Sequence, residues 1–275
     1  MKILKAIIPA GGTGTRMLPI TKSIPKELLP INMKPMIQYA VEEAIKSGIK
    51  ELLIVIRNDK EIIKHYFTGQ SNIKLINRKE IKNLNNLIKQ CKFHFTYQKE
   101  AKGLMDAISL SEDFVKNEPF AVLLPDNIML SRTPCIKQLI DGFNENDKYS
   151  YIILKKFIGG IDDVEVDVGC MESELISKTK NVYQINKIKK KKKNLIKLNK
   201  GETGLKNFGR YIFTEDVFDY IKKFRTECRG EFDDTPILNR LAMEGKLRGK
   251  LYNGIIFDTG NKNGFNSATL YFIKK

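Results

Sequence analysis

The sequence has few of the residues that build disulfide frameworks and zinc sites. It contains only two histidines and four cysteines in 275 residues. The cysteines are Cys91, Cys135, Cys170 and Cys228, which are scattered along the chain with no CxxC spacing. We therefore expect neither a disulfide framework nor a structural zinc site.

Long apolar runs are also missing. No stretch approaches the roughly 18–20 apolar residues that a membrane-spanning helix needs. Met1 and Lys2 lead directly into a short strand-like segment, which argues against a signal peptide. We therefore expect a cytoplasmic protein without a membrane partner.

Two familiar phosphate-binding patterns are absent as well. GxxxxGK[ST] does not occur near the N-terminus, and GxGxxG would need a glycine where Met17 stands. Nevertheless, AGGTGTR at Ala10–Arg16 follows the apolar run Ile3–Pro9 and has three glycines in four positions. Glycines allow an anion to approach the backbone N–H groups of a loop. The loop therefore predicts a phosphate site of another kind.

The formal net charge of +16 could suit a nucleic-acid partner. However, the basic excess is mostly lysine in a chain that is also rich in Ile and Asn, whose codons are A/T-rich. Genome composition alone would produce this bias. No nucleic-acid motif or aromatic interleaving accompanies the lysines, so we do not expect nucleic acid to be the main partner. The charge also suits polyanionic nucleotides.

The first half of the chain alternates strand and helix patterns. Short apolar runs predict buried strands at 52–56, 93–97, 120–124 and 151–154. A helix is expected between Pro35 and Gly48, because apolar residues repeat there at helical spacing. Segments 103–116 and 134–143 fit further crossover helices. This alternation predicts an α/β fold with a doubly wound, mostly parallel sheet.

The pattern loosens after about residue 155. Segments 164–176 and 182–188 predict strands of a smaller sheet, and the lysine-rich segment 187–200 predicts an exposed hairpin or mobile loop. FGRYIF at 208–213, two helical segments and FDTGNKNGF at 257–265 follow. We expect one domain over 1–275, with halves of about 1–155 and 156–275.

Two aspartates, Asp126 and Asp258, each follow an apolar run. Both are therefore expected at strand ends, where ligands of open α/β sheets bind. Mg²⁺ prefers oxygen ligands and commonly takes one or two carboxylates together with substrate phosphates. The position of these two aspartates after apolar runs also fits an alternative, in which each only forms a turn or caps a helix.

Several separate motifs carry a resemblance to a known family. They are AIIPAGGTGTRMLPITKSIPKELLP at 6–30, QKEAKG at 98–103, PFAVLLPD at 119–126, FGRYIF and FDTGNK. In this order they resemble the sugar-phosphate nucleotidylyltransferases, and PxTKxxPKE[ML]LP is closest to the bacterial UTP–glucose-1-phosphate uridylyltransferases. The resemblance covers most of the chain. It implies UTP and glucose 1-phosphate as partners, with a nucleotide-binding first half and a sugar-phosphate-binding second half.

The resemblance implies attack by a sugar-phosphate oxygen on the α-phosphorus of UTP, with release of pyrophosphate. It places Arg16 on the pyrophosphate, Lys26 near the reacting centre, and Asp126 and Asp258 on Mg²⁺. Such a transition state carries much negative charge and needs cations more than a covalent intermediate. The resemblance further implies that Ala10, Gly11, Gly12, Gly14, Thr15, Gln98 and Gly103 bind the nucleotide.

The sugar side departs from the family pattern. The family's KGLGHA is KGLMDA here, with Met105 and Asp106 in place of a glycine and a histidine. The resemblance implies that Gly169 and Lys191 bind the sugar phosphate, whereas the family's sugar-binding glutamate is replaced by Lys190. A lysine cannot accept hydrogen bonds from sugar hydroxyls. Carboxylates that could compensate are Asp106, favoured because it lies in the altered motif, Asp167 and Glu172.

Alternatives remain at this point. Thymine presents the same edge as uracil, so a dTTP-dependent enzyme or one for another sugar 1-phosphate fits the same motifs. The altered sugar side also fits a nucleotide-binding homologue without turnover, and the charge fits a polyanion-binding protein. Relatives commonly form dimers or tetramers, so a homodimer or homotetramer is conceivable.

Overall fold

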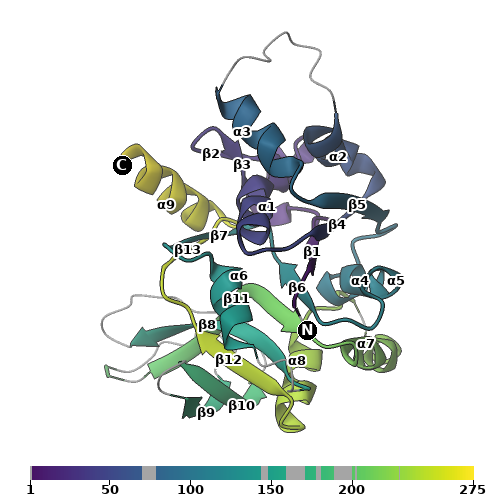
Figure 1. The fold of residues 1–275 in the computed structure, drawn as a ribbon, viewed down its shortest axis with the longest axis vertical. Coiled ribbons are helices and arrows are strands. Elements are labelled where there is room, and N and C mark those ends of the chain that lie inside the picture. Colours follow the sequence, from purple (N-terminus) through teal and green to yellow (C-terminus); the bar gives the residue numbers. More distant parts are fainter. Residues whose placement is uncertain are drawn as a thin grey trace.

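One nine-stranded sheet runs through the chain, in the order β5-β4-β1-β6-β11-β8-β12-β10-β9 (Figure 1). The computed structural model describes residues 2–69, 79–143, 148–158, 181–188, 200–201, 203–228 and 230–275, and the backbone of 171–177. Strands β11 and β10 run against the other strands of this sheet. The predicted α/β fold with a doubly wound, mostly parallel sheet is confirmed.

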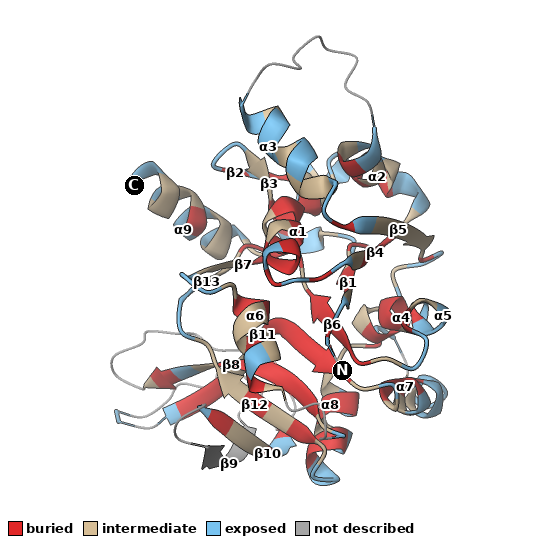
Figure 2. Cartoon of the chain, viewed as in Figure 1, coloured by how far each residue is buried: buried red, intermediate tan, exposed pale blue. Residues whose placement is uncertain are grey.

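The first four strands of the sheet are parallel to one another, as the sequence predicted. They are β5 (Lys92–Tyr97), β4 (Glu51–Ile56), β1 (Lys5–Pro9) and β6 (Phe120–Leu123). In β4, β1 and β6 the side chains are apolar on both faces, because helices cover both faces. Strand β5 lies at the edge of the sheet and is only partly buried, so the prediction of a buried strand at 93–97 was wrong in its burial. Figure 2 shows the resulting buried centre of the sheet.

Helices α1 (Met36–Lys46), α2 (Glu61–Thr68) and α6 (Cys135–Gly142) pack on one face, and α3 (Lys79–Ile88) lies near them. Helices α4 (Leu104–Ser109), α5 (Glu112–Val115), α7 (Val217–Arg225) and α8 (Thr235–Met243) cover the other face. In the predicted helix α1, the apolar repeat is buried from Met36 to Ile45. The sequence analysis did not anticipate α2 and α3 between β4 and β5.

The second half of the chain extends the same sheet. Its strands are β8 (Ser150–Ile158), β9 (Met171–Ser177), β10 (Val182–Ile188), β11 (Thr203–Phe213) and β12 (Leu247–Leu251). We expected the strands near 164–176 and 182–188 to form a smaller sheet, and this was wrong for β9 and β10. Because β12 pairs with both β8 and β10, the backbone hydrogen bonds continue into the main sheet. Part of the lysine-rich segment 187–200 lies outside the described residues.

Two small two-stranded sheets lie beside the main sheet. Strand β7 (Asn127–Leu130) pairs with β13 (Ile255–Asp258), and β2 (Pro30–Ile31) pairs with β3 (Lys34–Pro35). The final helix α9 (Lys262–Ile273) follows β13 and begins where Asn261 accepts a hydrogen bond from the Gly264 N–H. No helix in the described part of the chain is long and apolar enough to cross a bilayer.

A buried ion pair joins α1, β11 and the loop after β6. Arg210 on β11 is fully buried, and its Nη2 lies 2.8 Å from Oε2 of Glu43 on α1. The same guanidinium donates hydrogen bonds to the carbonyl oxygens of Leu124 and Asn127, both at 2.9 Å. Glu43 also accepts the N–H of Ile136 at the start of α6. One charged pair therefore fixes the backbone on both sides of Asp126.

We expect Glu43→Gln to destabilise the fold by about 3–5 kcal/mol, because it leaves the buried Arg210 charge without an anionic partner. Denaturant unfolding at pH 7 measures the effect. Glu42→Gln is the matched control, since Glu42 lies next to Glu43 on α1 but pairs with Lys34 and Lys46 nearer the surface. A loss as small as that of the control would contradict the structural role of the pair.

Candidate active site

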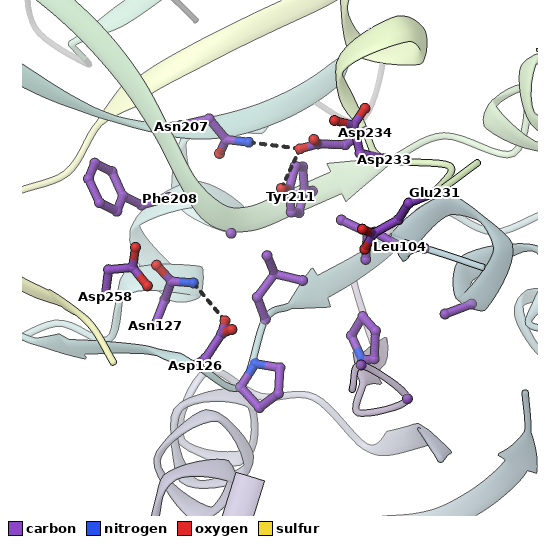
Figure 3. Close-up of a pocket in the computed structure, with 18 of the residues that line it drawn as sticks. Leu104, Asp126, Asn127, Asn207, Phe208, Tyr211, Glu231, Asp233, Asp234 and Asp258 are labelled. Carbon is purple, nitrogen blue, oxygen red and sulfur yellow. Dashed lines mark hydrogen bonds between the residues drawn. The ribbon is translucent and has the colours of Figure 1, made fainter. Parts of the chain in front are cut away.

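A cavity of about 660 Å³ opens at the carboxyl ends of β1 and β6 (Figure 3). This is the edge of the sheet at which open α/β folds bind ligands. Its lining combines the glycine-rich loop, the loop after β5, the loop after β6 and a wall from β11 and the start of α8. Of the predicted site residues, those that line the cavity are Gly11, Gly12, Arg16, Lys26, Gln98, Gly103, Asp126 and Asp258.

Three other predicted residues belong to the framework of the glycine-rich loop. Ala10 is fully buried, Gly14 precedes a 3₁₀ turn, and Thr15 begins that turn. Gly14 has φ +73°, a conformation that glycine adopts without strain. Gly12 faces more open space, since a Cβ there would come no closer than 3.8 Å to a neighbouring atom. A ligand can therefore approach the backbone closely at Gly12.

A buried lysine that the sequence analysis missed holds the glycine-rich loop in place. The Lys60 ammonium donates to the carbonyl oxygens of Ala10 and Gly12, at 2.8 and 2.6 Å. It also pairs with Oε2 of Glu27 at 2.8 Å. Burial lowers the pKa of Lys60, although Glu27 opposes this shift. The one available signal was its place shortly after β4. It was missed because a lysine in a loop looks like an ordinary surface residue.

Lys26 and Asp126 form an ion pair at the cavity, with Nζ 2.5 Å from Oδ2. Burial lowers the pKa of Lys26, but the carboxylates of Asp126 and Glu27 outweigh it and raise the pKa above its usual value. Burial would raise the pKa of Asp126, but Lys26 and Arg16 outweigh it and hold the pKa below its usual value. Both side chains are therefore charged at neutral pH, with Arg16 beside them.

The two predicted strand-end aspartates are brought together by the pairing of β7 and β13. In this register Asp258 lies opposite Asn127, the neighbour of Asp126. The N–H and hydroxyl of Thr259 both donate to the Asp126 carbonyl oxygen at 2.8 Å, which ties the two segments together. The side chain of Asn127 donates to Oδ1 of Asp126 at 3.1 Å (Figure 3). Asp126 and Asp258 thus line the same part of the cavity.

The carboxylates of Asp126 and Asp258 could hold a magnesium ion. The described residues contain no group of three or more His, Cys, Asp or Glu side chains that could ligate a metal. Mg²⁺ commonly takes only one or two protein carboxylates and completes its shell with water and substrate phosphates. Two carboxylates beside a glycine-rich loop therefore fit a metal that arrives with a phosphate ligand.

Gln98 and Gly103 lie in the loop between β5 and α4, and Gln98 lies beside Gly11 of the glycine-rich loop. The side-chain amide of Gln98 donates to the Gly103 carbonyl oxygen at 3.2 Å. Gly103 has φ +107°, and a Cβ there would lie 2.4 Å from the Phe232 carbonyl oxygen. Phe232 is in turn hydrogen bonded through its backbone to Lys102 and Met105. Gly103 is thus required by close packing of two loops as well as by its backbone conformation.

Asp106 does not lie where we expected it. Its side chain is 8% exposed, accepts a hydrogen bond from Gln98 and pairs with Arg225, and the residue is absent from the cavity lining. The prediction that Asp106 compensates for the missing sugar-binding glutamate was therefore wrong, because α4 turns this carboxylate toward Gln98 and α7. The other calls on the sugar side, Gly169, Lys191, Lys190 and Asp167, lie outside the described residues, and only the backbone of Glu172 is described.

The wall opposite the glycine-rich loop is polar and was missed by the sequence analysis. The Tyr211 hydroxyl donates to Oδ2 of Asp234 at 2.7 Å, and Asn207 donates to the same oxygen at 3.5 Å (Figure 3). Burial, together with Asp234, raises the pKa of Tyr211 well above its usual value. Glu231 and Asp233 line the same wall. The acidic segment EFDD at 231–234 was the available signal, but acidic residues before a helix usually look like caps.

We expect Lys26→Met to raise the pKa of Asp126, because the main group that opposes the effect of burial is then lost, and only the weaker effects of Arg16 and a backbone hydrogen bond remain. Carbon-13 NMR of the aspartate carboxyl groups during a pH titration measures this, with Asp126→Asn as the assignment control. In the wild type the folded pKa of Asp126 is depressed, so the pair stabilises the fold above about pH 4 and loses this effect as the pH falls. An unchanged pKa of Asp126 in Lys26→Met would contradict the coupling.

Comparisons with known proteins identify the family. The family model described as nucleotidyl transferase matches residues 5–274. UTP–glucose-1-phosphate uridylyltransferase 1 of Staphylococcus saprophyticus is 36% identical, with 100% of this chain and 94% of the relative covered. The corresponding protein of Staphylococcus epidermidis is 35% identical, with coverages of 100% and 93%.

Solved structures extend the likeness to the fold. A crystal structure of UDP-glucose pyrophosphorylase complexed with UDP-glucose superposes with a TM-score of 0.84 at 32% identity. The match covers 99% of this chain and 100% of the other. The resemblance drawn from the sequence motifs is thereby confirmed, and the chain belongs to the nucleotidyl transferase family.

Proposed function

We propose that this protein transfers a uridylyl group from UTP to glucose 1-phosphate and releases pyrophosphate. The observation that carries the proposal is one cavity that is lined both by the Lys26–Asp126 pair with Arg16 and by Gln98 with Gly103. A nucleoside triphosphate needs cations for its phosphates and a polar frame for its base, and the glycine-rich loop joins these two parts. Relatives and solved structures with the corresponding names support this substrate pair.

The residues around the cavity favour direct displacement at the α-phosphorus. The described lining includes no cysteine, serine or histidine that could serve as a covalent nucleophile. A phosphate oxygen of the sugar phosphate is already a nucleophile and needs no deprotonation at neutral pH. The protein then has to hold both phosphates in line and stabilise the negative charge that develops.

Arg16 and Lys26 supply that stabilisation in the proposed reaction. A guanidinium can bind phosphate oxygens in a bidentate manner, which suits Arg16 on the leaving pyrophosphate. The Lys26 ammonium is compact, remains charged, and is fixed by Asp126 beside the glycine-rich loop. Bound Mg²⁺ would supply further positive charge to the phosphates, and Asp126 and Asp258 are the residues that would hold it.

Two residues of the cavity lining each carry a side-chain oxygen that is free to accept a hydrogen bond from a ligand hydroxyl. Oε1 of Glu27 and Oδ1 of Asn207 are buried and have no hydrogen-bond partner among the described residues. A buried acceptor without a donor costs free energy, which a ligand hydroxyl can recover. A ribose and a hexose both offer such donors.

A thymidylyltransferase is the second candidate, because thymine offers Gln98 and Gly103 the same hydrogen-bonding edge as uracil. Which sugar is preferred depends on the segment with Gly169 and Lys191, whose roles stay predictions. A cytoplasmic location and a homodimeric or homotetrameric assembly also stay predictions.

Pyrophosphate release tests the function directly. The purified protein is assayed with Mg²⁺, with UTP or dTTP, and with a panel of sugar 1-phosphates. We expect the highest kcat/KM with UTP and glucose 1-phosphate. Turnover with dTTP or another sugar alone would favour the second candidate, whereas nucleotide binding without turnover on any pair would overturn the proposal.

Asp126→Asn should lower kcat by about a hundredfold or more, because it removes the charge that both positions Lys26 and would hold the metal. The fold should remain, which circular dichroism and thermal unfolding check. The matched control is Asp141→Asn, which removes an exposed aspartate paired with Lys137 on α6. Full activity of Asp126→Asn at ordinary Mg²⁺ concentration would contradict the assignment.

A further inference from the structure

The amide of Gln98 is held in one orientation by its neighbours. Its NH₂ group donates to Oδ2 of Asp106 at 2.7 Å and to the Gly103 carbonyl oxygen at 3.2 Å. An ionised carboxylate and a carbonyl oxygen only accept hydrogen bonds, so the NH₂ group must face them. Both N–H donors of Gln98 are therefore used inside the protein.

The remaining atom of the amide, Oε1, lies against the glycine-rich loop. A Cβ placed on Gly11 would be 2.3 Å from this oxygen, so the two are in close contact. No residue in the described part of the chain donates a hydrogen bond to it. Gln98 lines the cavity together with Gly11 and Gly103. It can thus offer a ligand an acceptor but no donor.

Asp106 is itself fixed from two sides. It lies in the first turn of α4 with its side chain almost fully buried, and its Oδ1 pairs with the guanidinium of Arg225 on α7. Arg225 is about half exposed, so the pair joins a surface cation to a buried carboxylate. A histidine at this position, as in the family motif, has a donor as well as an acceptor and would not impose the same orientation.

We propose that Asp106, held by Arg225, is a positioning residue that locks the Gln98 amide with Oε1 toward the base and thereby selects uracil over cytosine. The inference rests on the proposed function only in taking the nucleotide base to lie at Gln98. Uracil carries an N–H at N3, which an amide oxygen can accept. Cytosine carries a lone pair at N3, which would face the lone pairs of Oε1.

If Asp106 no longer fixes the Gln98 amide, the selectivity for UTP over CTP should fall, and not only the affinity for both nucleotides. In Asp106→Asn the new amide can turn either end toward Gln98, so only the longer hydrogen bond to the Gly103 carbonyl oxygen, at 3.2 Å, still holds the NH₂ group inward. The Gln98 amide can then rotate and offer its NH₂ group to cytosine. One hydrogen bond of this kind corresponds to about a tenfold change in an equilibrium constant. The preference for UTP over CTP should therefore fall about tenfold.

The experiment measures equilibrium binding of UTP and of CTP by isothermal titration calorimetry, together with kcat/KM for each nucleotide. The variants are Asp106→Asn and Arg225→Met. Lys222→Met is the matched control, because it removes a cation from the same helix whose exposed partner is Glu112. We expect the ratio of Kd values to fall in Asp106→Asn, to fall less in Arg225→Met, and to stay constant in Lys222→Met.

Two results would overturn the inference. One is a wild type that binds UTP and CTP equally well. The other is that Asp106→Asn and Arg225→Met weaken the binding of UTP and of CTP by the same factor. If Asp106→Asn does not fold, Arg225→Met decides, since its side chain reaches the surface. Turnover with unchanged selectivity would refute the positioning role and leave the proposed function standing. The expected shift in binding selectivity without any turnover would refute the proposed function and leave the positioning role standing.

Discussion

The buried pair of Arg210 and Glu43 is the contact on which the geometry of the candidate site depends. A single guanidinium binds the carboxylate of α1 and the carbonyl oxygens of Leu124 and Asn127, and so fixes the loop that carries Asp126. Lys60 does the same for the glycine-rich loop through the carbonyl oxygens of Ala10 and Gly12. Buried cations therefore set the backbone on both sides of the cavity before any ligand binds.

This arrangement divides the basic residues near the cavity by task. Arg210 and Lys60 bind backbone oxygens and buried carboxylates, whereas Arg16 and Lys26 line the cavity. Groups fixed in advance need not reorganise as charge develops in a transition state, which is the main advantage of a preorganised site. The rigid framework and the lack of a cysteine, serine or histidine in the described lining point to the same chemistry, a direct transfer between phosphates.

Local patterns in the sequence predicted much of this. Apolar runs identified β1, β4, β5 and β6, and the glycine-rich loop, Lys26, Asp126 and Gln98 were expected in one site and lie in one cavity. What the sequence could not predict depends on contacts between distant segments. The register of β7 with β13, the joining of β9 and β10 to the main sheet, and the turn of Asp106 toward Gln98 are set by tertiary packing. Lys60 and Arg210 look like ordinary basic residues until burial is known.

The central claim is that the uridylyl group passes directly from UTP to the sugar phosphate without a covalent intermediate on the protein. It is tested most directly by the stereochemistry at the α-phosphorus. UTP with sulfur in place of one non-bridging α-oxygen, in a single configuration, is converted with glucose 1-phosphate, and phosphorus-31 NMR assigns the product. One in-line displacement predicts inversion of configuration. Retention would contradict the account, because it requires two displacements and hence a uridylylated protein.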